Sequence, residues 1–132
     1  MNFLAAVLFV HVRKDEELTF ELFMALMARK GLIALFVEGV PDFHLRSFVF
    51  EKLLKKYVPN VSNHLQKLHI NIEMITGNWF MTLFSGFFGY NVVMPILDNF
   101  FLEGWPAVYR VSLILMRRLE PNILKCSSRE RI

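Results

Sequence analysis

Four histidines and one cysteine are the side chains of this sequence best suited to metal binding or nucleophilic catalysis. A helical metal site usually brings two histidines together at positions i and i+4, and a catalytic thiolate needs a histidine as its base. No two histidines have that spacing, and no cluster of carboxylates joins them: they are His11, His44, His64 and His69. Cys126 lies in a polar segment with no histidine near it in the sequence. We therefore expect no metal site and no catalytic thiol.

The glycine and serine motifs of nucleotide-binding and hydrolytic enzymes are also missing from the sequence. It contains no Walker-type phosphate loop, no dinucleotide-binding fingerprint and no serine nucleophile elbow. The basic residues of "KKY" and "MRRLE" fit solvated helix faces, so we expect no nucleic-acid contact from them. The residues alone predict no catalytic or cofactor-binding site, no cofactor, and a chain that is not itself an enzyme.

A stretch at residues 75–97 contains no Asp, Glu, Lys, Arg or His. Its length would allow a transmembrane helix, because about 20 apolar residues span a bilayer. Gly86, Gly89 and Asn91 interrupt the stretch and divide it into two helical halves of roughly a dozen residues, each too short to cross. We therefore expect two buried helices, with a small integral membrane protein as the less favoured alternative.

The composition is unusually apolar for a single domain of 132 residues. Apolar residues make up 55% of the chain, and the mean hydropathy is +0.39. These values fit either an integral membrane protein or part of a larger domain whose remainder covers some of the apolar faces. A single cysteine excludes an internal disulfide and favours a reducing compartment. We expect a cytoplasmic protein.

Basic charge is concentrated at the C-terminal end of the chain. The net charge is +3, of which residues 110–132 contribute +4 and residues 1–109 contribute −1. Pro121 is expected to end the last helix. We predict that residues 121–132 form a basic, disordered tail, with contact to an anionic membrane or nucleic acid as the less favoured interpretation.

Apolar residues recur at helical spacing along the whole chain, and no β-type alternation lasts for more than a few residues. The pattern predicts an all-α, multi-helix fold. Asp15 and Asn71 are candidate N-caps. The expected helices cover residues 2–12, 16–30, 42–57, 61–68, 72–85, 91–103 and 106–120.

Periodicity also predicts which helix faces are buried. Leu45, Val49 and Leu53 are expected to form the buried stripe of the third long helix, with Phe48 beside them. The expected stripe of the last helix consists of Val108, Val111, Leu115 and Leu119.

Four segments carry a resemblance to a known family. In order, they are "FEKLLKKYVP", "NWFMTLFS", "ILDNFFLEGW" and "YRVSLILM". Over residues 43–119 the chain resembles the C-terminal half of the TBC domain of Rab GTPase-activating proteins. Its opening "MNFLAAVLF" resembles the stretch that directly follows the family's Y-x-Q-G motif. The resemblance implies that residues 1–120 are a partial, all-helical TBC domain.

The resemblance also implies a function. The family accelerates GTP hydrolysis by Rab proteins with an arginine from an I-x-x-D-x-x-R motif and a glutamine from Y-x-Q-G. Neither motif occurs in this sequence, and Arg46, Arg110, Arg117 and Arg118 are outside such a motif. We expect part of a regulator of membrane traffic, inactive alone, with a Rab-type small GTPase as partner. The alternative that the resemblance leaves open is a non-catalytic module that binds a Rab or another partner.

Two further expectations about partners follow. Peripheral membrane association is expected through the GTPase, with recruitment to endomembranes. Self-association is expected through apolar faces that the rest of the domain would otherwise cover.

Six residues occupy family motif positions, and we expect structural roles for them. We predict core or helix-junction packing for the tryptophans, a helix stop at the glycine, and a hydrogen bond at a helix end for the aspartate. The six residues are Trp79, Phe80, Asp98, Glu103, Gly104 and Trp105. The chain departs from the family at "PILD", where Pro95 and Leu97 replace a basic residue and a tryptophan of many relatives.

Overall fold

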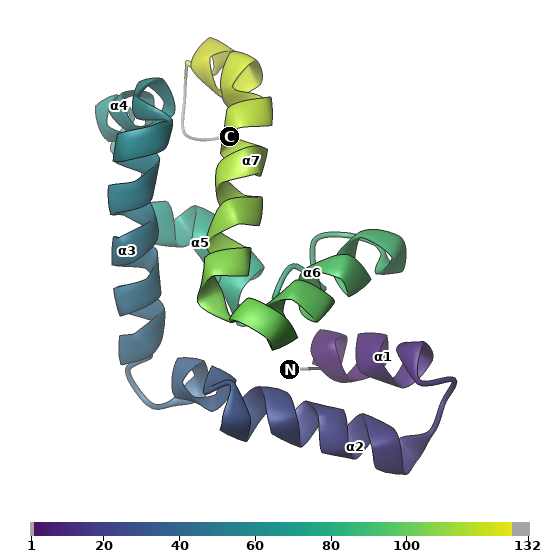
Figure 1. The fold of residues 1–132 in the computed structure, drawn as a ribbon. Coiled ribbons are helices and arrows are strands. Elements are labelled where there is room, and N and C mark those ends of the chain that lie inside the picture. Colours follow the sequence, from purple (N-terminus) through teal and green to yellow (C-terminus); the bar gives the residue numbers. More distant parts are fainter. Residues whose placement is uncertain (1, 128–132) are drawn as a thin grey trace.

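A computed structural model describes residues 2–127, and this part of the chain is built from helices without a β-strand. Seven α-helices are joined by one π-helical and one 3₁₀-helical turn in the described range. The all-α prediction is confirmed. Figure 1 shows two groups of helices, with α3, α4, α5 and α7 in one and the α1–α2 pair in the other.

The N-terminal pair consists of α1 (Asn2–His11) and α2 (Glu16–Met24), which pack against each other. Asp15 caps α2, because its Oδ1 accepts a hydrogen bond from the Leu18 backbone N–H at 2.9 Å. The π-helical turn η1 (Ala25–Arg29) follows, and Gly31 then takes a left-handed φ of 70°. A 3₁₀ turn, η2 (Leu32–Phe36), leads toward α3.

The helices α3 (Pro41–Tyr57) and α4 (Pro59–Lys67) both begin at a proline, where the missing N–H costs no hydrogen bond. The predicted buried stripe of α3 is wrong at Leu45 and Phe48, whereas Val49 and Leu53 are half-buried and pack against the core. Leu45 and Phe48 are each 54% exposed. The residues that α3 buries are Phe43, Ser47, Phe50 and Leu54.

Two adjacent faces of α3 are apolar, so periodicity alone could not select the buried one. Ser47 made the correct face look more polar than it is. Its hydroxyl is fully buried and forms a hydrogen bond with the Thr76 hydroxyl at 2.9 Å. A buried polar group is tolerated when it has such a partner.

The uncharged stretch is divided between α5 (Ile72–Met81) and α6 (Tyr90–Glu103). Asn71 caps α5 as predicted, but the helix ends four residues earlier than expected. Leu83 and Phe84 have positive φ values of 45° and 65°, which end the helix while both side chains stay fully buried. None of the helices within residues 2–127 is long and apolar enough to span a membrane.

The last helix, α7 (Trp105–Lys125), continues through Pro121, although the sequence predicted that it ends there. Pro121 removes only one backbone hydrogen bond, and the helix runs on for four more residues. Val108 of the predicted stripe is buried, but Leu119 is 38% exposed and Met116 and Ile123 are buried instead. Residues 128–132 lie outside the described range, and the division into 1–120 and a 121–132 tail stays a prediction.

The core lies where α3, α5, α6 and α7 approach one another. In Figure 1, α3 and α7 stand side by side, with α5 behind and α6 leading from α7 toward α1. Four fully buried phenylalanines occupy this core: Phe50, Phe80, Phe84 and Phe100. The helices therefore converge on the region that holds most of the family motif residues.

Candidate functional site

Two of the six motif residues, Phe80 and Trp105, meet in an aromatic junction at the centre of the core, and a third, Trp79, packs on Phe84 and Phe87. Trp79, Phe80 and Trp105 are at most 7% exposed. The ring of Phe80 meets the Trp105 indole edge-on, with centroids 5.5 Å apart and planes at 71°. Phe100 approaches Trp105 from α6 at 5.9 Å and 89°. Such edge-to-face pairs add to the stabilisation from burial. The junction joins "NWFMTLFS" to "ILDNFFLEGW".

Gly104 forms the sharp turn that brings Trp105 into this junction. Its φ of 76° and ψ of −141° lie in a region that is essentially restricted to glycine. The turn is held on both sides, because the Gly104 N–H donates to the Phe100 carbonyl at 2.8 Å and the Gly104 carbonyl accepts from the Ala107 N–H at 3.1 Å. Gly104 thus ends α6 and begins α7.

Glu103 forms an ion pair across the same turn. Its carboxylate accepts a hydrogen bond from the Arg110 guanidinium, one and a half turns into α7. Both side chains are exposed, so this pair contributes little stability by itself.

Asp98 has a different position from the other motif residues. It is exposed near the middle of α6, and its carboxylate has no hydrogen-bond partner within residues 2–127. The predicted hydrogen bond at a helix end is therefore not formed there. Asp98 lies eight residues after the start of α6, so its carboxylate is too far from the free N–H groups of the first turn to accept a hydrogen bond from them.

Arg46 joins α3 to the aromatic junction. Its guanidinium lies 4.8 Å from the centroid of the Trp105 ring, and its Nε donates to the Asp42 carboxylate at 3.3 Å. This arrangement combines a cation–π contact with an i,i+4 ion pair. Sequence reasoning set Arg46 aside because it lies outside the family's arginine motif. Its spacing of four residues from Asp42 was the sequence feature that could have predicted the ion pair.

Tyr109 is a second residue that sequence reasoning did not single out. Its side chain is 9% exposed, and it packs on Phe80 and Trp105. Its buried hydroxyl forms no hydrogen bond within the described part of the chain. Burial raises the pKa of this hydroxyl, and the nearby Arg46 charge partly opposes the rise. Tyr109 follows Trp105 by four residues, so helical spacing already placed both on one face.

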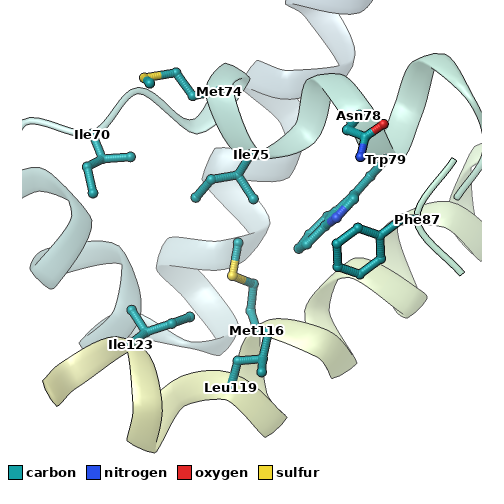
Figure 2. Close-up of a pocket in the computed structure, with 9 residues that line it drawn as sticks. All are labelled: Ile70, Met74, Ile75, Asn78, Trp79, Phe87, Met116, Leu119 and Ile123. Carbon is teal, nitrogen blue, oxygen red and sulfur yellow. The ribbon is translucent and has the colours of Figure 1, made fainter. Parts of the chain in front are cut away.

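An apolar groove of about 340 Å³ lies between α5 and α7, beside the aromatic junction (Figure 2). Figure 2 shows Met74, Ile75 and Trp79 on one side and Met116, Leu119 and Ile123 on the other. Phe87 and Asn78 lie at one end of the groove, and Ile70 lies at the other. Met74 is 63% exposed and Phe87 is 49% exposed, so apolar surface is available to solvent along it. This groove can offer apolar and aromatic contact to another polypeptide.

The histidines are distributed over the structure. No group of three or more His, Cys, Asp or Glu side chains within residues 2–127 is placed to hold a metal ion. His44 Nδ1 lies 2.6 Å from Glu73 Oε1, which links α3 to α5. His11 Nδ1 lies 3.1 Å from the Tyr90 hydroxyl, and His64 Nε2 donates to the Cys126 carbonyl at 2.9 Å. Each of these three contacts joins segments distant in sequence.

The all-helical fold is consistent with part of a TBC domain. The sequence model of the Rab-GTPase-TBC domain matches residues 1–124. This chain belongs to the Rab-GTPase-TBC domain family, and the predicted resemblance is confirmed.

Several full-length proteins of this family are similar to the chain. It is 36% identical to the Rab GTPase-activating protein tbc-11 of Caenorhabditis elegans, over 95% of this chain and 13% of that protein. It is 32% identical to the GTPase-activating protein GYP5 of Saccharomyces cerevisiae, over 95% of this chain and 14% of that protein. Human TBC1 domain family member 1 is 26% identical over the whole chain and 11% of its own length. The chain thus spans only a small part of each relative.

These matches correct one expectation from the sequence. The absence of recognisable catalytic motifs led to the prediction that the chain is not an enzyme. That assignment is wrong, because the relatives are GTPase-activating proteins, which stimulate GTP hydrolysis. The prediction failed because an activating protein completes the active site of a GTPase and does not need a self-contained one.

Proposed function

We propose that this chain forms the C-terminal half of a TBC domain within a Rab GTPase-activating regulator of membrane traffic. The observation that carries this proposal is a hollow of about 440 Å³ between α1 and α2. Its lining is almost entirely apolar and includes Ala5, Ala6, Phe9, Phe20 and Phe23. Phe20 is 65% exposed, which is costly for so large an apolar side chain. Another part of the domain would cover this surface.

In this proposal the catalytic side chains come from outside the 132 residues. The arginine and glutamine motifs that the family resemblance implies are not present in the sequence. The chain would hold the neighbouring half of the domain in place and contribute to the contact with the GTPase. Phe80, Gly104 and Trp105 would support it structurally through the aromatic junction. Trp79 would do so by packing on Phe84 and Phe87, and Glu103 through Arg110. Asp98 and Glu103 are the exposed motif residues, and Asp98 is the one without an ion pair among the described residues.

We further propose that the partner is a Rab-type small GTPase and that the protein acts in the cytoplasm. Recruitment to endomembranes would follow from the membrane-bound GTPase. The names of the relatives in Caenorhabditis elegans and Saccharomyces cerevisiae support a GTPase as the partner. The identity of the Rab would be found by testing a panel.

A binding experiment tests this function. The chain is immobilised and exposed to a panel of Rab proteins loaded with a non-hydrolysable GTP analogue or with GDP. We expect at least one Rab to be retained in the GTP state and weakly or not at all in the GDP state. If no member of the panel is retained, the proposed GTPase contact of this half-domain is wrong.

A second candidate function is a Rab-binding module that does not change hydrolysis. The absence of both catalytic motifs from the sequence favours it. Retention of a Rab by the chain, together with an unchanged hydrolysis rate when the chain is joined to a TBC N-terminal half, would select this second function. Faster hydrolysis by the joined protein would select the first.

Self-association is a related proposal, because the α1–α2 hollow is open. Light scattering across a range of protein concentrations should show a mass that rises above 15.5 kDa. Exchange of Phe20 for Ser should reduce the association. A wild-type chain that stays monomeric at every concentration would contradict this proposal.

A further inference from the structure

The solvent-facing side of α7 carries basic charge at regular spacing. The exposed charged residues of this helix are Arg110, Arg117, Arg118 and Lys125. Arg110 and Arg117 are seven residues apart, as are Arg118 and Lys125, so each pair is separated by about two helical turns. The one acidic residue of α7, Glu120, is half-buried and accepts a hydrogen bond from Asn60 Nδ2 at 3.0 Å. The exposed charge on this helix therefore has a single sign, although Arg110 is ion-paired with Glu103 at the end of α6.

Apolar side chains project between these cations. Ile114 is 55% exposed and Leu124 is 41% exposed. Tyr57, at the end of α3, is 51% exposed and lines one shallow hollow with Arg110, Ile114 and Arg117. We call the surface formed by Arg110, Ile114, Arg117, Arg118, Leu124 and Lys125 the basic α7 face. Lys56 extends it, with its Nζ 5.4 Å from the centroid of the Tyr57 ring.

We propose that the basic α7 face binds an anionic lipid surface directly. Arg110 to Lys125 extend over about 22 Å of helix, which is long enough to contact several lipid headgroups. Cations near an anionic bilayer are attracted to it, and exposed apolar side chains among them can enter the boundary between headgroups and acyl chains. An acidic protein would satisfy the charges, but Ile114 and Leu124 project outward from the helix instead of lining a deep pocket. The lipid contact requires no GTPase, so it is independent of the proposed function.

Vesicle co-sedimentation with the 132-residue chain tests the proposal. One vesicle type is pure phosphatidylcholine, and the other also contains about one-third phosphatidylserine as the anionic lipid. The test variant is Arg117→Glu/Arg118→Glu. The matched control is Arg13→Glu/Lys14→Glu, which changes the net charge equally in the turn between α1 and α2. Arg13 and Lys14 already have positive φ values, so glutamate at these sites does not introduce a new class of backbone strain.

We expect the wild-type chain to sediment with the anionic vesicles and to dissociate from them as salt is raised. With neutral vesicles the chain should remain in the supernatant. The Arg117→Glu/Arg118→Glu variant should bind at least about 25-fold more weakly, since each basic side chain contributes about fivefold. The control variant should lose much less of its affinity for the anionic vesicles. Circular dichroism verifies the helical content of both, and Lys125→Gln serves as a milder second variant at the exposed end of α7.

Three outcomes would overturn the proposal. Equal binding to both vesicle types would show that charge is not the determinant. An equal loss of vesicle binding in the control variant would show that binding depends on the net charge of the chain and not on the basic α7 face. Binding to soluble polyglutamate in the absence of vesicle binding would identify an acidic protein surface as the partner.

Discussion

The ring of Phe80 in α5 meets the indole of Trp105 at the start of α7 edge-on, with centroids 5.5 Å apart. These two residues come from separate motifs, and their contact joins the two helices in the centre of the core. Phe50, Phe100 and Tyr109 complete the aromatic surroundings. The junction therefore supports the helices that line the α5–α7 groove.

Replacement of Phe80 with Ala should strongly destabilise the chain. Phe80 is fully buried, so we expect a loss of about 3–5 kcal/mol in the free energy of unfolding. Leu102→Ala is the matched control, because Leu102 is 81% exposed and should change this free energy by less than about 0.5 kcal/mol. Urea denaturation followed by tryptophan fluorescence measures both. Similar losses in the two variants would contradict the described junction.

The turn at Gly104 makes a second prediction. Its backbone conformation is strained for any residue with a Cβ, although a Cβ there would meet no neighbouring atom. Gly104→Ala should therefore cost about 1–3 kcal/mol in the free energy of unfolding through backbone strain.

Gly77→Ala is the control for Gly104→Ala, because it should change the free energy of unfolding in the opposite direction. Gly77 is helical, and an added Cβ would lie 3.8 Å from Phe43, an ordinary contact. Alanine at this site should stabilise the chain by about 0.5–1 kcal/mol. Thermal denaturation of the two variants should thus give shifts in opposite directions, and a stabilised Gly104→Ala variant would contradict the turn geometry.

The buried face of α3 can be tested against the face that periodicity predicted. Leu54 is 1% exposed and Leu45 is 54% exposed. Leu54→Ala should lower the free energy of unfolding by about 2–5 kcal/mol, whereas Leu45→Ala should change it by less than about 0.5 kcal/mol. The reverse order in chemical denaturation would restore the face with Leu45, Val49 and Leu53 as the buried one.

The sequence predicts which segments are helical better than it predicts how the helices pack. The caps at Asp15 and Asn71 and the helical class were predictable, because they depend on local spacing and hydrogen bonding. The buried face of α3 was not, because Ser47 is buried through a partner 29 positions away. The early end of α5 depends on Leu83 and Phe84, whose left-handed backbone is compensated by complete burial. Such tertiary effects have no local signal.

The candidate site was predictable to a similar extent. The resemblance identified Trp79, Phe80 and Trp105, and the structure buries all three but brings only Phe80 and Trp105 into ring contact. It did not identify the stacking of Arg46 on Trp105 or the buried hydroxyl of Tyr109, because both depend on how α3 and α7 pack.

The burial of Tyr109 predicts that the free energy of unfolding decreases at alkaline pH. Because burial raises its pKa in the folded state, the neutral form is favoured by folding, and ionisation above the unfolded pKa of about 10 disfavours the folded state. The contribution of Tyr109 to the free energy of unfolding should be fully present below about pH 10 and should decrease as the pH rises further.

Tyr109→Phe should reduce that alkaline loss of stability. At neutral pH it should be neutral or stabilising by up to about 1 kcal/mol, because it removes a buried hydroxyl that forms no hydrogen bond with the described residues. Urea denaturation at a series of pH values from 8 to 11, with Tyr57→Phe as an exposed control, measures this effect. An identical pH dependence in wild type and Tyr109→Phe would contradict it.

Single-turnover GTP hydrolysis tests the proposed half-domain most directly. The segment of the Caenorhabditis elegans relative that precedes its match to this chain is fused ahead of Met1 and assayed with a panel of GTP-loaded Rab proteins. We predict that the fusion accelerates hydrolysis by at least one Rab by about 10³-fold or more, while the 132-residue chain alone does not. Equal acceleration by the chain alone, or a folded fusion that accelerates no Rab in the panel, would contradict the account.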